Sequence, residues 1–264
     1  MNPGRIYALT IRYFILTTHE LGRLALLIYY PILDIALFGY MSMWMQQSSP
    51  GTINITLLYL TTIVLWSTVL TINTELSLNL RKELESRNLV NLFSTPMQLD
   101  EWIIAGVIIS FFKALFSIAL GTIISKFFFD VNILHAGIGL IPIALSLSIS
   151  GLALSFFIIG ILIFGGLQIT TIIWSIPYLV LTFSAPFYSV DVLPQWIQPI
   201  TKALPTTHAF EALRHLIEHG ATPLNTLLTS FMLNGIYLII SICFFIYMFN
   251  KSKERGLAQL EQGQ

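Results

Sequence analysis

The sequence predicts an all-α polytopic membrane protein in which six helices cross the bilayer. Hydrophobic residues make up 55% of the 264-residue chain and charged residues only 10%, well below the roughly 25% typical of a soluble domain. Each of six apolar stretches is near or above the ~20 residues that a helix needs to cross a ~30 Å hydrocarbon core. They cover residues 24–45, 55–78, 102–128, 136–164, 169–188 and 224–249. Because backbone polar groups in lipid must be satisfied within the segment, we expect each stretch to be helical.

Charge balance and cysteine content exclude several classes of protein. The chain carries 13 basic and 13 acidic residues, so its net charge is zero and we expect no nucleic-acid partner. Its single cysteine, Cys243, lies inside the last apolar stretch, which excludes a disulfide within the chain and a cysteine metal site. One helical bundle accounts for the length, and we interpret residues 1–264 as a single transmembrane domain.

Basic residues next to the predicted spans indicate the orientation. With a cytoplasmic N-terminus, most of them fall on the inner side, as the positive-inside rule requires. The inner set is Arg5, Arg12, Arg23, Arg81, Lys82, Arg87, Lys251, Lys253 and Arg255, and the outer set is Lys126, Lys202 and Arg214. We therefore expect a multi-pass protein of the bacterial cytoplasmic (inner) membrane, with the lipid bilayer around it and both termini in the cytoplasm. The first apolar stretch is too long for a signal peptide core and has no small-residue cleavage site, so it should remain as a helix.

Residues 1–20 precede the first span and are expected to form a helix that lies in the inner membrane interface. Ile6, Leu9, Tyr13 and Leu16 recur with helical spacing, and Pro3 suits an early helical turn. The alternative is a mobile basic tail that only helps to set the topology.

The strongest run of charge lies in the predicted cytoplasmic loop 81–100, between the second and third spans. Its charged residues precede an apolar set with helical spacing, and Pro96 ends the set before the next helix begins. We interpret this loop as a short amphipathic coupling helix that docks a partner, whereas the alternative is a solvated connector that fixes topology. The residues assigned to this role are Glu83, Glu85, Arg87, Leu89, Leu92, Phe93 and Pro96.

Residues 191–220, between the fifth and sixth spans, are too polar to cross a membrane. We expect an extracytoplasmic re-entrant helical hairpin that dips into the outer interface. Pro205 suits the first turn of its second helix, Gly220 suits the residue that ends it, and Phe210, Leu213 and Ile217 form an apolar stripe. The candidate functional residues of this hairpin are Pro194, Trp196, Pro205, Glu211 and Arg214.

Away from the ends of the predicted spans lie three charged residues, and each is a functional hypothesis because intramembrane charge is costly. They are Asp34, Glu75 and Lys113. Counting along the first and third spans places Asp34 and Lys113 at the same depth, about 15 Å from the cytoplasmic side, so we predict an ion pair between them. A kink at Pro31 would shift this register, and the alternative for Lys113 is to extend toward the interface.

Sequence motifs for catalysis or nucleotide binding are absent. No Gly-x-x-x-x-Gly-Lys-Ser/Thr segment occurs, so the chain has no P-loop for nucleotide phosphates. Neither a nucleophile elbow nor a His-Glu-x-x-His segment occurs. His215 and His219 have the spacing nearest to a metal pair, but with Glu211 and Glu218 we interpret them as a solvated helix face. We expect no metal and no cofactor in this chain.

Two segments resemble the ABC-2 family of membrane permeases. The inner loop has the family's charged residues, leucines and Ser/Thr-Pro ending, although Arg87 and Asn88 stand where glycine and threonine are usual. It reads Glu85-Ser86-Arg87-Asn88-Leu89-Val90-Asn91-Leu92-Phe93-Ser94-Thr95-Pro96. The outer loop has Leu193-Pro194-x-Trp196, then Leu204-Pro205-Thr206 and Glu211-Ala212-Leu213-Arg214. With the six spans, the resemblance covers nearly the whole chain.

The resemblance implies a membrane-spanning permease subunit of an ATP-driven exporter, with no enzymatic activity of its own. It also implies a homodimer, or a heterodimer, bound to a separate ATP-binding cassette ATPase that holds ATP and Mg²⁺. The sequence does not choose among drugs, lipids and glycans as substrates. Two other classes stay open: a proton-coupled carrier that uses Asp34 or Glu75 as a relay, and an intramembrane lipid-modifying enzyme built on His208, His215 and His219.

Overall fold

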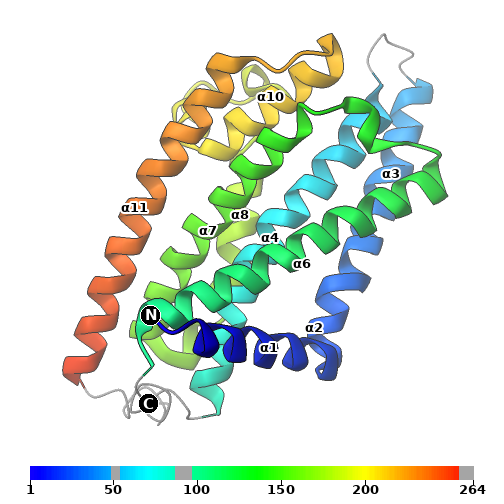
Figure 1. Cartoon of the computed structure of the whole chain (residues 1–264). Helices are drawn as coiled ribbons and strands as arrows, with labels where there is room; N and C mark the ends of the chain where they lie inside the picture. The colour runs from blue at the N-terminus through cyan, green and yellow to red at the C-terminus, as the bar shows by residue number, and fades with distance from the viewer. Residues whose placement is uncertain (49–53, 87–96, 256–264) are drawn as a thin grey trace.

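A computed structural model shows a bundle of long helices (Figure 1). The structure describes residues 1–48, 54–86 and 97–255, and every regular element within these ranges is helical. Five helices of the described part are long and apolar enough to cross a membrane. The first is built from α2 (Leu21–Leu24), the π-helical turn η1 (Ala25–Tyr29) and α3 (Tyr30–Ser48). The others are α4 (Ile55–Glu85), α6 (Leu99–Phe129), α7 (Leu140–Gly165), which η3 (Gly166–Ile169) extends, and α11 (Leu224–Arg255).

The fifth predicted span forms a shorter helix, α8 (Ile172–Phe183), which has 12 residues. At 1.5 Å per residue it is about 18 Å long, which is less than the ~30 Å hydrocarbon core. Residues with positive φ interrupt the chain on both sides, namely Gly166 (67°) and Ala185 (47°), which precedes Pro186. Even so, this segment carries the chain from the end of the bundle where α7 finishes to the opposite end, where α10 lies (Figure 1). Residues 1–48, 54–86 and 97–255 therefore contain five full-length candidate spans and one shorter apolar helix.

A π-helical turn accommodates the proline in the first span. Pro31 has no backbone N–H and cannot bond to the carbonyl four residues earlier. The chain widens into η1 just before it, where the N–H of Tyr30 donates to the carbonyl of Ala25. Such a turn holds one extra residue, and at 3.6 residues per turn this rotates the following helix by about 100°. The direction of every later side chain in α3 depends on this turn.

Residues Pro3–His19 form α1, which lies across the end of the bundle where α6 begins (Figure 1). Asn2 caps the helix, because its Oδ1 accepts the N–H of Gly4 at 2.9 Å. The apolar stripe expected from the sequence faces the protein, since Leu9 and Tyr13 are buried. A second apolar set on α1 is exposed, consisting of Tyr7, Ile11, Phe14 and Ile15.

The core of the bundle runs along α4 and α7, which are its most buried helices. Two glycines let α7 approach its neighbours closely. A Cβ on Gly151 would lie 3.0 Å from the carbonyl oxygen of Val69 in α4, and one on Gly160 would lie 3.3 Å from Cα of Phe245 in α11. Small residues allow this close packing of helix backbones in membranes. In contrast, most of the apolar surface of α3 and α11 stays exposed.

The segment expected to form the outer hairpin contains a short turn, η4 (Val190–Val192), and two helices, α9 (Gln198–Ala203) and α10 (Pro205–His219). Pro205 is the first residue of α10, and Gly220 ends it in the left-handed conformation with φ of 72°. α10 lies at the opposite end of the bundle from α1 (Figure 1). Its stripe packs against the other helices, because Phe210 and Leu213 are fully buried.

Candidate functional site

Two of the seven predicted coupling residues lie in the described part of the chain. Glu83 and Glu85 lie in the last turns of α4. Glu83 is completely buried, and its Oε1 lies 2.9 Å from Nη2 of Arg12 in α1. Glu85 is on the surface, where its Oε1 lies 2.6 Å from Nε of Arg81. The other assigned residues, Arg87, Leu89, Leu92, Phe93 and Pro96, lie outside the described residues.

A second buried carboxylate holds α1 on the far side of the same loop. Glu101, in the first turn of α6, accepts the backbone N–H of Asn2 at 2.6 Å and that of Gln98 at 3.2 Å. Its other contact is with Arg5, whose Nη1 lies 3.4 Å from Oε2. Ion pairs therefore tie α1 both to the helix that enters the predicted cytoplasmic loop and to the helix that leaves it.

Deeper in the bundle, five buried polar side chains form what we call the inner charge network: Thr17, Arg23, Glu75, Asn79 and Lys113. The ammonium group of Lys113 in α6 donates to Oε2 of Glu75 and to Oγ1 of Thr17. Arg23 donates from Nη1 to Oδ1 of Asn79 at 2.7 Å, and the same nitrogen lies 3.7 Å from Oε1 of Glu75. Asn79 donates from Nδ2 to Glu75 at 3.1 Å. The network joins α1, α2, α4 and α6.

The inner charge network continues to the surface through Glu20. This carboxylate lies 3.0 Å from Nε of Arg23 and 2.6 Å from Nζ of Lys82. The hydrogen bond from Lys82 holds the pKa of Glu20 below its usual range. A chain of alternating charges thus runs from the surface of α4 to the interior of the bundle.

The predicted ion pair between Asp34 and Lys113 is wrong. Lys113 pairs with Glu75 on the adjacent helix instead. Counting residues gave the depth of Asp34 but not the direction of its side chain, which the π-helical turn before Pro31 rotates. In the described part of the chain, Asp34 has neither an ion pair nor a hydrogen bond.

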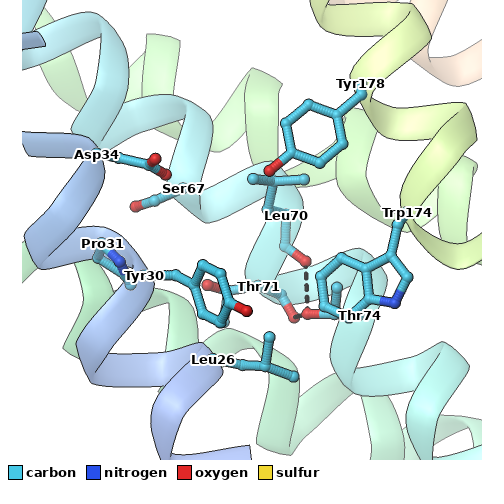
Figure 2. A pocket seen from close by; sticks show the side chains of 10 residues that line it. All are labelled: Leu26, Tyr30, Pro31, Asp34, Ser67, Leu70, Thr71, Thr74, Trp174 and Tyr178. Atoms are coloured by element: carbon cyan, nitrogen blue, oxygen red, sulfur yellow. Dashed lines mark hydrogen bonds between the residues drawn. The ribbon is translucent and has the colours of Figure 1, made fainter. Parts of the chain in front are cut away.

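Asp34 lines a pocket of about 360 Å³ between α3, α4 and α8, which we call the α3–α8 pocket. Figure 2 shows Asp34 and Tyr30 on one side, Trp174 and Tyr178 on the other, and α4 residues such as Ser67 behind them. The pocket combines one carboxylate with three aromatic rings and several hydroxyl groups.

In the outer segment, Arg214 of α10 holds the chain that follows α8. Its Nη2 donates to the carbonyl oxygen of Tyr188 at 2.7 Å and to that of Ala185 at 3.2 Å. Burial lowers the pKa of Arg214. These bonds hold the segment in which Ala185 has its positive φ.

Of the other predicted outer residues, Trp196 and Glu211 lie on the surface, and Pro194 and Pro205 shape the backbone. Trp196 is 73% exposed. Pro205 opens α10, and Glu211 lies on the surface, 3.8 Å from Nδ1 of His208. Pro194 accepts at its carbonyl the N–H of Ile197 at 2.9 Å, which turns the chain toward α9.

Two of the three histidines of α10 form a surface pair. The rings of His215 and His219 stack with centroids 4.3 Å apart, and Nδ1 of His215 lies 2.9 Å from the carbonyl oxygen of Ala221. Among the described residues, no group of three or more histidine, cysteine, aspartate or glutamate side chains could hold a metal ion.

Sequence reasoning missed a second buried polar cluster, between α7 and α11. Ser150 donates to Oδ1 of Asn234 at 2.7 Å, and Asn234 donates to the carbonyl oxygen of Ser146 at 2.9 Å. Ser230 donates to the carbonyl oxygen of Pro205 at 2.7 Å, which attaches α10 to α11. The available signal was a pair of polar residues four apart in each of two largely apolar helices, Ser146 and Ser150 in α7 and Ser230 and Asn234 in α11.

The family model described as ABC-2 type transporter matches residues 5–217 of the chain. The matched range begins in α1 and ends within α10, so it includes the inner charge network, the α3–α8 pocket and most of the outer segment. No match was found among curated proteins.

Proposed function

Because the chain belongs to the ABC-2 type transporter family, we propose that it is the membrane-spanning permease subunit of an ATP-driven exporter. A separate ATP-binding cassette subunit hydrolyses ATP with Mg²⁺, since this sequence has no P-loop. Two permease subunits, most simply two copies of this chain, form the translocation pathway between them. The exposed apolar surfaces of α3 and α11 support such an arrangement, because only lipid or another subunit can cover them.

The observation that carries this proposal is the attachment of α1 to both sides of the predicted coupling loop. Glu83, before the loop, pairs with Arg12, and Glu101, after the loop, binds Asn2 and Arg5. A movement of the loop caused by the ATPase would therefore move α1 with it. Helices held in this way can exchange between two packings that nucleotide binding biases.

The inner charge network gives this movement a route into the first span. Lys113 in α6 contacts Thr17 at the end of α1, and Arg23 at the start of the first span contacts Asn79 in α4. Displacement of α1 would change these contacts, which are strong because they are charged and buried. The first span would then shift relative to α4, along the wall of the α3–α8 pocket.

We place both termini in the cytoplasm of a bacterial cell, with this chain in the cytoplasmic membrane. α1 and the Arg255 end of α11 lie at the same end of the bundle (Figure 1). This supports an even number of crossings, with α8 as a short sixth one. The basic residues beside the spans support the same orientation.

Co-purification with the ATPase tests the docking part of the proposal. Leu92→Asp and Phe93→Asp should each abolish recovery of an ATP-binding cassette protein with the tagged permease, while leaving membrane insertion intact. Asn91→Asp is the matched control, because it adds the same charge at a position that is already polar. Full recovery of the ATPase with both Leu92→Asp and Phe93→Asp would remove the docking claim.

The energy source separates this proposal from a proton-coupled carrier. Glu75 already forms an ion pair with Lys113 and lies close to Arg23. These contacts do not suit a carboxylate that must exchange protons freely as a relay. Export by the proposed complex should stop when nucleotide is removed and should survive collapse of the proton gradient. The opposite result would favour the carrier.

A further inference from the structure

Asp34 is the intramembrane charge that the described structure leaves uncompensated. Glu75 and Lys113 neutralise each other, whereas Asp34 has no ion pair and no hydrogen bond in the described residues. A carboxylate at membrane depth is costly, and such residues face a cavity or a partner group. Asp34 faces the α3–α8 pocket, whose volume of about 360 Å³ lies within the ~300–1,000 Å³ of pockets that hold drug-sized ligands.

The walls of the pocket suit an apolar cation. Tyr30 from the first span faces Trp174 and Tyr178 from α8 across the opening (Figure 2). Aromatic faces attract cations through their quadrupole, most strongly for tryptophan. Among the described residues that line the pocket there is no lysine or arginine, so none of them competes for Asp34.

Two of the hydroxyl groups that line the pocket, those of Ser67 and Thr74, donate within their own helices and not to the carboxylate. The Oγ of Ser67 is 2.9 Å from that of Ser117 and donates to the carbonyl oxygen of Val64 at 2.7 Å. The Oγ1 of Thr74 donates to the carbonyl oxygen of Leu70 at 2.7 Å. Because these two donors serve their own helices, they leave the charge of Asp34 available to a ligand.

We propose that the α3–α8 pocket binds a cationic amphiphile, with its positive group against Asp34 and its apolar body between Tyr30, Trp174 and Tyr178. A neutral ligand would leave the carboxylate uncompensated, and an anion would be repelled by it. The identification of this ligand as an exported substrate rests on the proposed function. The binding itself requires neither ATP nor the ATPase.

Tetraphenylphosphonium and tetraphenylborate are suitable probes, because they have nearly the same size and shape and opposite charge. The full chain in nanodiscs of zwitterionic lipid should bind tetraphenylphosphonium saturably and tetraphenylborate only as empty nanodiscs do. Asp34→Asn should weaken tetraphenylphosphonium binding about tenfold or more, since it removes the charge and keeps the shape. Asp130→Asn is the matched control, because Asp130 is exposed at the end of α6 in a left-handed conformation that asparagine tolerates. It should bind as the wild type does.

Trp174→Leu provides a second variant that does not alter charge, and it should weaken binding about fivefold through loss of the aromatic face. Equal saturable binding of the two ions, no saturable binding of tetraphenylphosphonium, or unchanged affinity in Asp34→Asn would each overturn the proposal. If Asp34→Asn does not fold, unchanged affinity in Trp174→Leu overturns it. If these binding predictions fail while the ATPase still co-purifies, the pocket assignment is refuted and the permease function stands. Loss of co-purification by itself would not affect the pocket assignment.

Discussion

Removing Glu75 should destabilise the protein more than removing Lys113, although the two residues form one ion pair. The side chains of both are more than nine-tenths buried. In the Glu75→Gln variant, the ammonium of Lys113 keeps neutral acceptors, the glutamine amide oxygen and the hydroxyl of Thr17, but its positive charge remains buried without a counter-charge. Breaking a buried pair in this way costs about 3–5 kcal/mol.

In the Lys113→Met variant, Glu75 keeps two other partners. Asn79 still donates to it at 3.1 Å, and Nη1 of Arg23 still lies 3.7 Å away. The loss is then close to that of one hydrogen bond to a charged group, about 1.5–3 kcal/mol. In the double variant no ammonium is left unpaired. Its loss of unfolding free energy should therefore be smaller than the sum of the two single-variant losses by about 2 kcal/mol.

Unfolding in mixed micelles by added sodium dodecyl sulfate, followed by tryptophan fluorescence, measures these free energies. The control cycle combines Asp34→Asn with Lys113→Met, for which the losses should add to within about 0.5 kcal/mol because the residues are not in contact. Strictly additive losses for Glu75→Gln and Lys113→Met would refute the reasoning. So would a larger loss in Lys113→Met than in Glu75→Gln.

Two further predictions concern the outer segment. Arg214→Met should lower the free energy of unfolding by about 1.5–3 kcal/mol, because its guanidinium donates to two backbone carbonyls; Glu211→Gln, on the exposed side of the same helix, should change it by less than about 0.5 kcal/mol. If thermal denaturation shows that the two variants lower stability equally, the hydrogen bonds from Arg214 do not stabilise the segment that follows α8. Ile200→Cys, in a Cys243→Ala background, should react slowly with a membrane-impermeant thiol reagent because we expect Ile200, which is 51% exposed in the isolated chain, to lie in the headgroup layer. Labelling as fast as that of Gln47→Cys would show that the segment extends into water.

Much of the architecture was predictable because hydropathy and helix-ending residues act locally. The long apolar stretches form the five candidate spans, and Pro205 and Gly220 mark the ends of α10 as expected. The cost of intramembrane charge was enough to single out Asp34, Glu75 and Lys113. The family resemblance of the two loops is confirmed by the match over residues 5–217.

What the sequence determined by itself is therefore the all-α membrane fold class, the positions of the five long spans along the chain and three of the residues that need an electrostatic partner. The tertiary structure decided which partner each one has. Depth along a helix follows from counting residues, but the direction of a side chain depends on rotation about the helix axis, which the π-helical turn before Pro31 changes. Asp34 consequently turns to the α3–α8 pocket, while the packing of α6 against α4 brings Lys113 to Glu75. Thr17 and Arg23 join the inner charge network only because packing brings helices from distant parts of the sequence together.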